Sequence, residues 1–256
     1  MKGWLILKHS LRQVFGNLQG ALKVSAVLYL AQFVVGLAVT GGAVLGMGSP
    51  QDMMAGGGPG AGFFGGILVA VIVSVVTGLW IAVGWHRYVL LGEEASYVPT
   101  FRGDRMGAYF LRSLGYGLIL VIIGMIWGTV IGFVLASVTG GSMAATVVGL
   151  AVLVYLPIMV LGFRMASDLP STALNADHPF MSGWAATAGA TADLAVMAVI
   201  IVVAGLVIGG IGQFLFGHIA VLSLIWALVI GWVQIMVGVS ILTTLYGHYI
   251  EKRELV

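Results

Sequence analysis

The sequence predicts an all-α protein, a polytopic membrane helix bundle with six transmembrane helices and short interfacial helices. Two observations support this fold class. Of the 256 residues, 60% are hydrophobic and 8% are charged, whereas soluble domains carry about 25% charged residues. The uncharged stretches at 24–51, 53–85, 113–163 and 194–250 all exceed the roughly 20 residues that cross a bilayer. We expect one membrane-embedded domain over residues 1–256.

The two longest uncharged stretches must each cross the membrane twice. Residues 113–163 would extend about 77 Å as one helix, against a hydrocarbon core of roughly 30 Å. Small residues at 139–142 predict the turn in this stretch, and Gln213, Gly217 and His218 mark the turn in residues 194–250. With one earlier hairpin, six spans are expected at about 21–42, 62–85, 113–138, 143–163, 194–212 and 219–247.

The basic residues predict the orientation of these spans. All 11 Lys and Arg residues fall on one side of the six-span topology. Because cytoplasmic loops retain Lys and Arg, both termini are expected in the cytoplasm. Residues 24–51 are too long a stretch for the core of a signal peptide, and no Ala-x-Ala site follows them. We therefore expect the N-terminus to be retained.

Short interfacial helices are expected before the hairpins. Apolar residues recur at steps of three or four near the N-terminus, at Trp4, Leu7, Leu11, Phe15 and Leu18. This period predicts a helix in the plane of the membrane surface over residues 1–20, which Gly16 and Asn17 would end. Asp104 is expected to cap a second such helix, and Asp177 to start a third that contains Trp184.

Glycines in two spans favour close helix packing. Span 3 carries Gly124, Gly128 and Gly132 at four-residue spacing, and span 5 carries Gly205 and Gly209. Such strips let a second backbone approach closely, and in lipid these packing contacts drive helix association. We expect packing within the chain, with a surface for another subunit as the alternative.

Three polar residues are expected within or near the hydrocarbon. Gln32 and Gln234 lie near the middle of spans 1 and 6, where an amide needs a hydrogen-bonding partner, and they could bond to each other. Their simplest role is to hold helices together, and the alternative is a polar step in a solute path. Asp193 is expected to stay near the headgroups and to pair with Arg112 or Arg164.

The sequence contains no pattern typical of catalysis. It has no cysteine, no H-E-x-x-H or G-x-S-x-G motif and no Walker-type loop. The histidines beside Arg87 and Tyr249 are expected to contact lipid headgroups. We therefore expect no enzymatic activity, no cofactor and no metal site. The absence of a basic stripe argues against a nucleic-acid partner.

Several short motifs resemble a family of bacterial membrane proteins. They are Phe15, Gly16 and Asn17, then Arg164 with Leu169 and Pro170, then Trp184, Thr187 and Gly189, and finally residues 242–246. In these motifs the chain resembles the six-span bacterial inner-membrane proteins that include the YciC-like group and the membrane domain of glycerophosphodiester phosphodiesterases. The resemblance implies a bacterial inner-membrane protein without an established reaction, and it transfers no catalytic residue.

Together these features predict a non-enzymatic accessory or scaffolding subunit, in contact with the lipid bilayer and with other integral membrane proteins or a second copy. Such a subunit could belong to an energy-transducing complex. The alternative is a channel or facilitator for a small neutral solute or lipid. In that case Gln32 and Gln234 would line the path, and Pro157, which removes a backbone donor and predicts a kink in span 4, would gate it.

Overall fold

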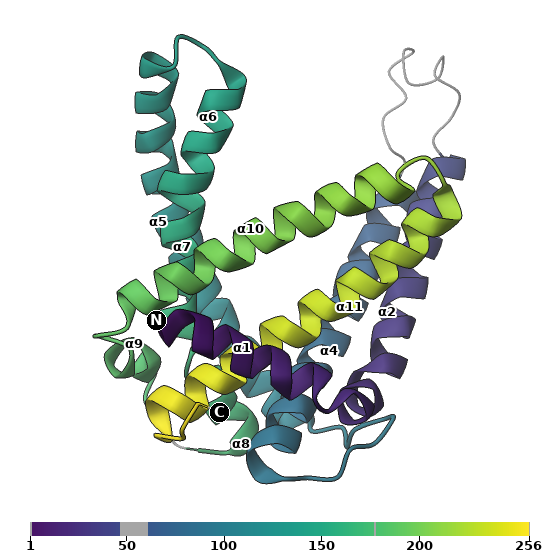
Figure 1. Ribbon diagram of the computed structural model, residues 1–256. Coiled ribbons are helices and arrows are strands. Elements are labelled where there is room, and N and C mark those ends of the chain that lie inside the picture. Colours follow the sequence, from purple (N-terminus) through teal and green to yellow (C-terminus); the bar gives the residue numbers. More distant parts are fainter. Residues whose placement is uncertain (1, 47–60, 177, 256) are drawn as a thin grey trace.

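The structure is a computed structural model that describes residues 2–46, 61–176 and 178–255. These residues form helices and no strand (Figure 1). The elements are α1 (Lys2–Phe15), α2 (Leu18–Gly46), α4 (Ala61–Leu91), α5 (Gly103–Val138), α6 (Met143–Leu150), the π-helical η1 (Ala151–Tyr155), α7 (Leu156–Ala166), α8 (Leu169–Leu174), α9 (Ser182–Ala186), α10 (Thr191–Phe216), α11 (Ala220–Leu245) and the π-helical η2 (Tyr246–Ile250). In the part of the chain that the structure describes, six helical segments are long and apolar enough to cross a membrane. The predicted all-α class with six spans is confirmed.

Three helical hairpins make up the bundle, and they diverge from a common end. The hairpins are α2 with α4, α5 with α6 to α7, and α10 with α11. Figure 1 shows α1, α8, α9 and both chain ends in its lower half, where the hairpins come together. At the opposite end the tip of the α5–α6 hairpin stands apart from the tips of α2, α10 and α11 (Figure 1). Large apolar side chains at the diverging ends are open to the surroundings, for example Phe133 at 80% and Phe214 at 82% exposed.

The buried core lies at the common end. One cluster joins Ile6 of α1 to Leu194 of α10 and Leu245 of α11. A second cluster contains Trp85, and a third contains Met165. Since lipid solvates apolar side chains as well as a protein interior does, the diverging ends need no such core. Packing therefore defines the tertiary structure mainly where the chain meets the polar surface.

The predicted N-terminal helix is confirmed, its place at the membrane surface stays a prediction, and its predicted apolar stripe is only partly buried. α1 ends at Phe15, immediately before Gly16. It buries Ile6, Leu7 and Val14 against the bundle. Trp4 and Phe15 from the predicted stripe are about half exposed, at 48% and 50%. The helix therefore has exposed apolar residues in addition to its buried ones.

The second and third interfacial helices differ from the predictions. α5 starts at Gly103 and continues into the span, so Asp104 lies in the first turn of a long helix and caps no separate one. α9 contains Trp184 as expected and starts at Ser182. The predicted starting residue Asp177 lies outside the described residues. α8, which directly follows α7, was not predicted.

The predicted turn between spans 3 and 4 is confirmed. α5 ends at Val138 and α6 begins at Met143. Gly140 and Gly141 between them have φ angles of 58° and 83°. Glycine adopts such left-handed conformations without a steric penalty, which explains why the helix ends there.

Span 4 has a π-helical segment shortly before Pro157, where a kink was predicted. η1 precedes α7, and Pro157 is the second residue of α7. Because proline has no backbone N–H, the carbonyl of Leu153 one turn earlier loses its helical donor. The indole Nε1 of Trp127 on α5 donates to this carbonyl at 2.7 Å. The hairpin thus satisfies in lipid the acceptor that the proline leaves free.

The two glycine patterns have different surroundings. A Cβ placed on Gly128 would lie 3.6 Å from Val154, while Cβ atoms on Gly124 and Gly132 would lie about 4 Å from Ile158 and Leu150. The strip of span 3 thus faces its own hairpin partner, at ordinary van der Waals distance. In span 5, a Cβ on either Gly205 or Gly209 would have no neighbour within 4 Å among the described residues. Packing of that pair against another helix stays a prediction.

Candidate functional site

The buried carboxylate of Asp168 is the centre of a hydrogen-bond network at the common end of the three hairpins. We call this end the polar end. Asp168 lies between α7 and α8 and is 0% exposed. Its carboxylate oxygens lie 2.7 and 2.9 Å from the Tyr116 hydroxyl of α5. The Ser182 hydroxyl donates to Oδ2 at 2.9 Å, and the Gly183 backbone N–H donates at 3.2 Å. The Arg112 guanidinium is 3.9 Å away. One side chain therefore joins α5 to α8 and α9.

Arg112 extends this network to the chain that connects α8 and α9. Its guanidinium donates to the Ser171 hydroxyl at 3.0 Å and to the His178 carbonyl at 2.8 Å. A Cβ on Gly183 would meet backbone atoms of Arg164 and Asp168 at 2.9 Å. Glycine at 183 thus permits the close approach on which the Gly183 hydrogen bond to the carboxylate depends. We name Asp168, Tyr116, Arg112, Ser182 and Gly183 the Asp168 network.

A second polar junction surrounds His86, which is completely buried. The two nitrogens of its ring lie 2.9 Å from the Thr243 hydroxyl of α11 and 3.2 Å from the Tyr109 hydroxyl of α5. The expectation that His86 contacts lipid headgroups is wrong. The imidazole is instead a link between α4, α5 and α11.

Two arginines share the carboxylate of Glu93. Arg87 Nε and Nη2 lie 3.0 and 2.5 Å from Glu93 Oε1, and Arg102 Nη2 lies 3.2 Å from the same atom. Arg87 also donates to the Ala173 carbonyl of α8 at 2.7 Å. The hydrogen bond from Arg87 is the main reason why the pKa of Glu93 lies below its ordinary value. The loop after α4 is thereby fastened to α8.

Glu93 predicts a loss of stability in acid. Because its folded pKa lies below the ordinary value near 4.5, the ion pairs contribute fully above that value and are lost as the pH falls through the lowered pKa. We expect Glu93→Gln to lower the unfolding temperature at about pH 7 and to approach the wild type as the pH falls through the lowered pKa of Glu93. Thermal unfolding in detergent across this range measures the difference. Glu94→Gln is the control, and a constant offset of the Glu93 variant at every pH would contradict the assignment.

Asp193 lies at the polar end as expected, but its predicted ion pair is wrong. Its Oδ1 accepts a hydrogen bond from the backbone N–H of Lys2 at 3.1 Å. Arg112 belongs to the Asp168 network, and Arg164 stacks on the Trp184 ring at 3.7 Å. Asp193 therefore fastens the first turn of α1 to the first turn of α10.

The two membrane glutamines are not brought together. The Thr77 hydroxyl of α4 lies 3.0 Å from Gln32 Oε1, so Gln32 links the helices of the first hairpin. Gln234 is exposed and lines a cavity of about 380 Å³ between α10 and α11, together with Gln213 and Trp226. Within the described residues no side chain forms a hydrogen bond with Gln234.

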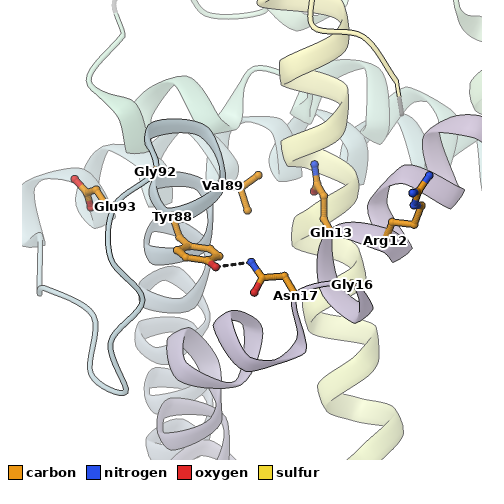
Figure 2. Close-up of a pocket in the computed structure, with 8 residues that line it drawn as sticks. All are labelled: Arg12, Gln13, Gly16, Asn17, Tyr88, Val89, Gly92 and Glu93. Atoms are coloured by element: carbon orange, nitrogen blue, oxygen red, sulfur yellow. Dashed lines mark hydrogen bonds between the residues drawn. The ribbon is translucent and has the colours of Figure 1, made fainter.

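A larger groove opens at the polar surface where α1 turns into α2. Figure 2 shows this groove, which has a volume of about 530 Å³. It is lined by Arg12, Gln13, Gly16 and Asn17 on one side and by Tyr88, Val89, Gly92 and Glu93 on the other. The amide of Asn17 donates to the Tyr88 hydroxyl across it (Figure 2). We call this cavity the α1–α4 groove.

Sequence reasoning missed the Asp168 network, the His86 junction and this groove. One signal was available, because Asp168 is an acidic residue close behind the last turn of span 4. No cluster of His, Cys, Asp or Glu within the described ranges is arranged to hold a metal ion. Comparison of the chain with family models, curated proteins and solved structures finds no match.

Proposed function

We propose that this chain is a non-enzymatic scaffolding or accessory protein of the bacterial inner membrane, which packs against other integral membrane proteins. The observation that carries this proposal is the outer face of the α10–α11 hairpin. There, glycine backbone and polar side chains are exposed, although both helices are apolar enough to span the membrane.

Open glycines and exposed amides meet on this hairpin. Gly205 and Gly209 of α10 leave room for a second backbone. Gln213 and Gln234 are exposed beside the cavity between the two helices. An amide in hydrocarbon gains a hydrogen bond when a neighbouring helix supplies one, and small residues let that helix come close. This combination favours a protein neighbour over lipid alone.

The basic end supports the proposed orientation. All 11 Lys and Arg residues belong to the elements of the common end or to helix ends beside it (Figure 1). Because cytoplasmic segments retain basic residues, we propose that this end and both termini face the cytoplasm.

The channel alternative receives no support from the arrangement of its residues. Gln32 is bonded to Thr77, and Gln234 lies on the exposed face of α11. Pro157 lies in α7, on the opposite side of the molecule from α2 (Figure 1). A continuous polar path would require these side chains to face one another.

Native gel electrophoresis with mass spectrometry tests the scaffold proposal. The protein is extracted from its native membranes in mild detergent and captured by its C-terminus. We expect stoichiometric co-migration with other membrane proteins, which Gly205→Leu with Gly209→Leu abolishes because two large side chains fill the open strip. Gly65→Leu on α4, where a Cβ also has no neighbour within 4 Å, is the matched control. Migration of the wild-type protein alone would refute the proposal.

A further inference from the structure

The Lys and Arg side chains differ in how they are bonded. Those from α4 onward all donate to acceptors of the protein, and they are Arg87, Arg102, Arg105, Arg112, Arg164, Lys252 and Arg253. Among the described residues, the side chains of Lys8, Arg12 and Lys23 have no acceptor. These three lie on α1 or near the start of α2. The fold thus bonds its later cations internally and leaves cations of the N-terminal part free.

α1 is fastened to the ends of two apolar helices. At its first turn, the backbone N–H of Lys2 donates to Asp193 in the first turn of α10. Further along, the Ser10 hydroxyl donates to Thr244 Oγ1 near the C-terminal end of α11, at 2.9 Å. Both α10 and α11 are apolar enough to cross a membrane. A helix that runs between the ends of two spans has the depth of the lipid headgroups.

The free cations are interleaved with exposed apolar side chains. Lys8 and Arg12 are exposed and lie one helical turn apart, on the same side of α1. In Figure 2 the Arg12 side chain extends away from Tyr88. Large apolar side chains of this segment are 40–50% exposed, and they are Trp4, Leu5, Phe15, Leu18 and Leu22. We call these five residues, together with Lys8, Arg12 and Lys23, the N-terminal face. Its composition is typical of a helix that lies in the headgroup region.

The N-terminal face has a surplus of positive charge. Glu93 lines the same groove as Arg12, but its carboxylate is shared by Arg87 and Arg102. Glu94 lines a cavity of about 310 Å³ together with Lys23 and forms no ion pair within the described residues. Three free cations therefore stand against one free carboxylate. Such a surplus attracts anionic lipids to a surface at headgroup depth.

We infer that the N-terminal face binds anionic phospholipids, with the headgroup phosphates at Lys8, Arg12 and Lys23. A guanidinium binds phosphate oxygens through charge-assisted hydrogen bonds. The exposed apolar side chains, such as Trp4 and Phe15, enter the boundary between headgroups and acyl chains. A zwitterionic headgroup also carries a cation, which the free cations repel, so it binds less well. The inference concerns the polar end and is independent of the protein-docking face of α10 and α11.

Native mass spectrometry of the purified full chain tests this inference. The protein is equilibrated in mixed micelles that contain equal amounts of phosphatidylglycerol and phosphatidylcholine with matched acyl chains. We expect the phosphatidylglycerol adduct to exceed the phosphatidylcholine adduct by about fivefold or more, since one cation near an anionic surface has an effect of this size. The preference is expected to fall as the salt concentration rises, because salt screens exposed charges. Equal adducts of the two lipids at low salt would overturn the inference.

Variants assign the preference to the N-terminal face. Arg12→Gln is expected to reduce the preference for phosphatidylglycerol, and adding Lys8→Gln and Lys23→Gln is expected to abolish it. Lys252→Gln is the matched control, because it removes the same charge from an ammonium that donates to the Tyr249 carbonyl, and it is expected to preserve the preference. The three free cations have no protein acceptor to lose, and thermal unfolding confirms that each variant is folded. A folded triple variant with the preference of the Lys252→Gln protein would refute the assignment.

Inorganic phosphate distinguishes a lipid from a free anion at these cations. We expect the phosphatidylglycerol adduct to persist in a large excess of phosphate, as it does in chloride of the same ionic strength, because the exposed apolar side chains hold only the lipid. Loss of the adduct in phosphate but not in chloride would assign the cations to a free phosphate and overturn the inference.

Discussion

Asp168→Asn is expected to lower the free energy of unfolding by about 3 kcal/mol or more. Every partner of this carboxylate donates: the hydroxyls of Tyr116 and Ser182, the Gly183 N–H and the Arg112 guanidinium. A carboxylate accepts on both oxygens, whereas an amide would point two N–H donors at these donors. Even this isosteric change therefore places N–H donors against other donors in a buried site, where water cannot accept from them.

Thermal unfolding of the protein in mild detergent measures this effect. We expect the midpoint to fall by about 6 °C or more, together with faster proteolysis between α8 and α9. Asp104→Asn is the matched control, because Asp104 pairs with Arg105 at the surface and its side chain is 67% exposed. Such exposed pairs contribute about 1 kcal/mol or less. An Asp168 variant as stable as the control would show that the network does not hold these helices together.

His86→Leu is expected to destabilise the protein by about 2 kcal/mol. Leucine fills much of the same volume but cannot bond to the hydroxyls of Tyr109 and Thr243. Thr243 also donates to the Val239 carbonyl at 2.9 Å, so it keeps a partner. Tyr109 is 5% exposed, and its hydroxyl is left without a hydrogen-bonding partner. The main cost thus comes from a single buried hydroxyl.

A double variant isolates that cost. Adding Tyr109→Phe to His86→Leu removes the orphaned hydroxyl, so we expect the double variant to recover about half of the lost stability. His218→Ala in the turn between α10 and α11 is the control, because this histidine is exposed. If Tyr109→Phe lowered the stability of the His86→Leu protein further, the hydrogen bond between the two rings would not be the dominant interaction.

Hydropathy and glycine placement were sufficient to predict the six spans and the main turns, but not α8 or the π-helical segments. Long uncharged stretches define the six spans because hydrocarbon excludes charge and requires each segment to satisfy its own backbone. The turn at 139–142 and the end of α1 before Gly16 follow from local conformational preferences. These features depend on neighbours within a few residues along the chain.

The sites depended on contacts between residues far apart in the sequence. Asp168 meets Tyr116 across 52 positions, and His86 meets Thr243 across 157. Asp193 was expected to bond to an arginine and bonds to the backbone of Lys2, 191 positions away. A charge pattern can suggest which residues attract one another, but several arginines were equally good partners by charge alone. The packing of α1, α8 and α9 decided among them.

The sequence by itself determined the fold class, the six spans and the placement of all basic residues on one side, because each follows from the transfer of individual segments between water and lipid. Only the tertiary structure decided which polar groups meet. It placed the span 3 glycines against their hairpin partner, left the α10–α11 face open and formed the α1–α4 groove. The reason is that lipid solvates the apolar helix surfaces equally well on every side, so hydropathy does not specify which helix faces which. Buried hydrogen bonds at the polar end, such as those of Asp168 and His86, specify it instead.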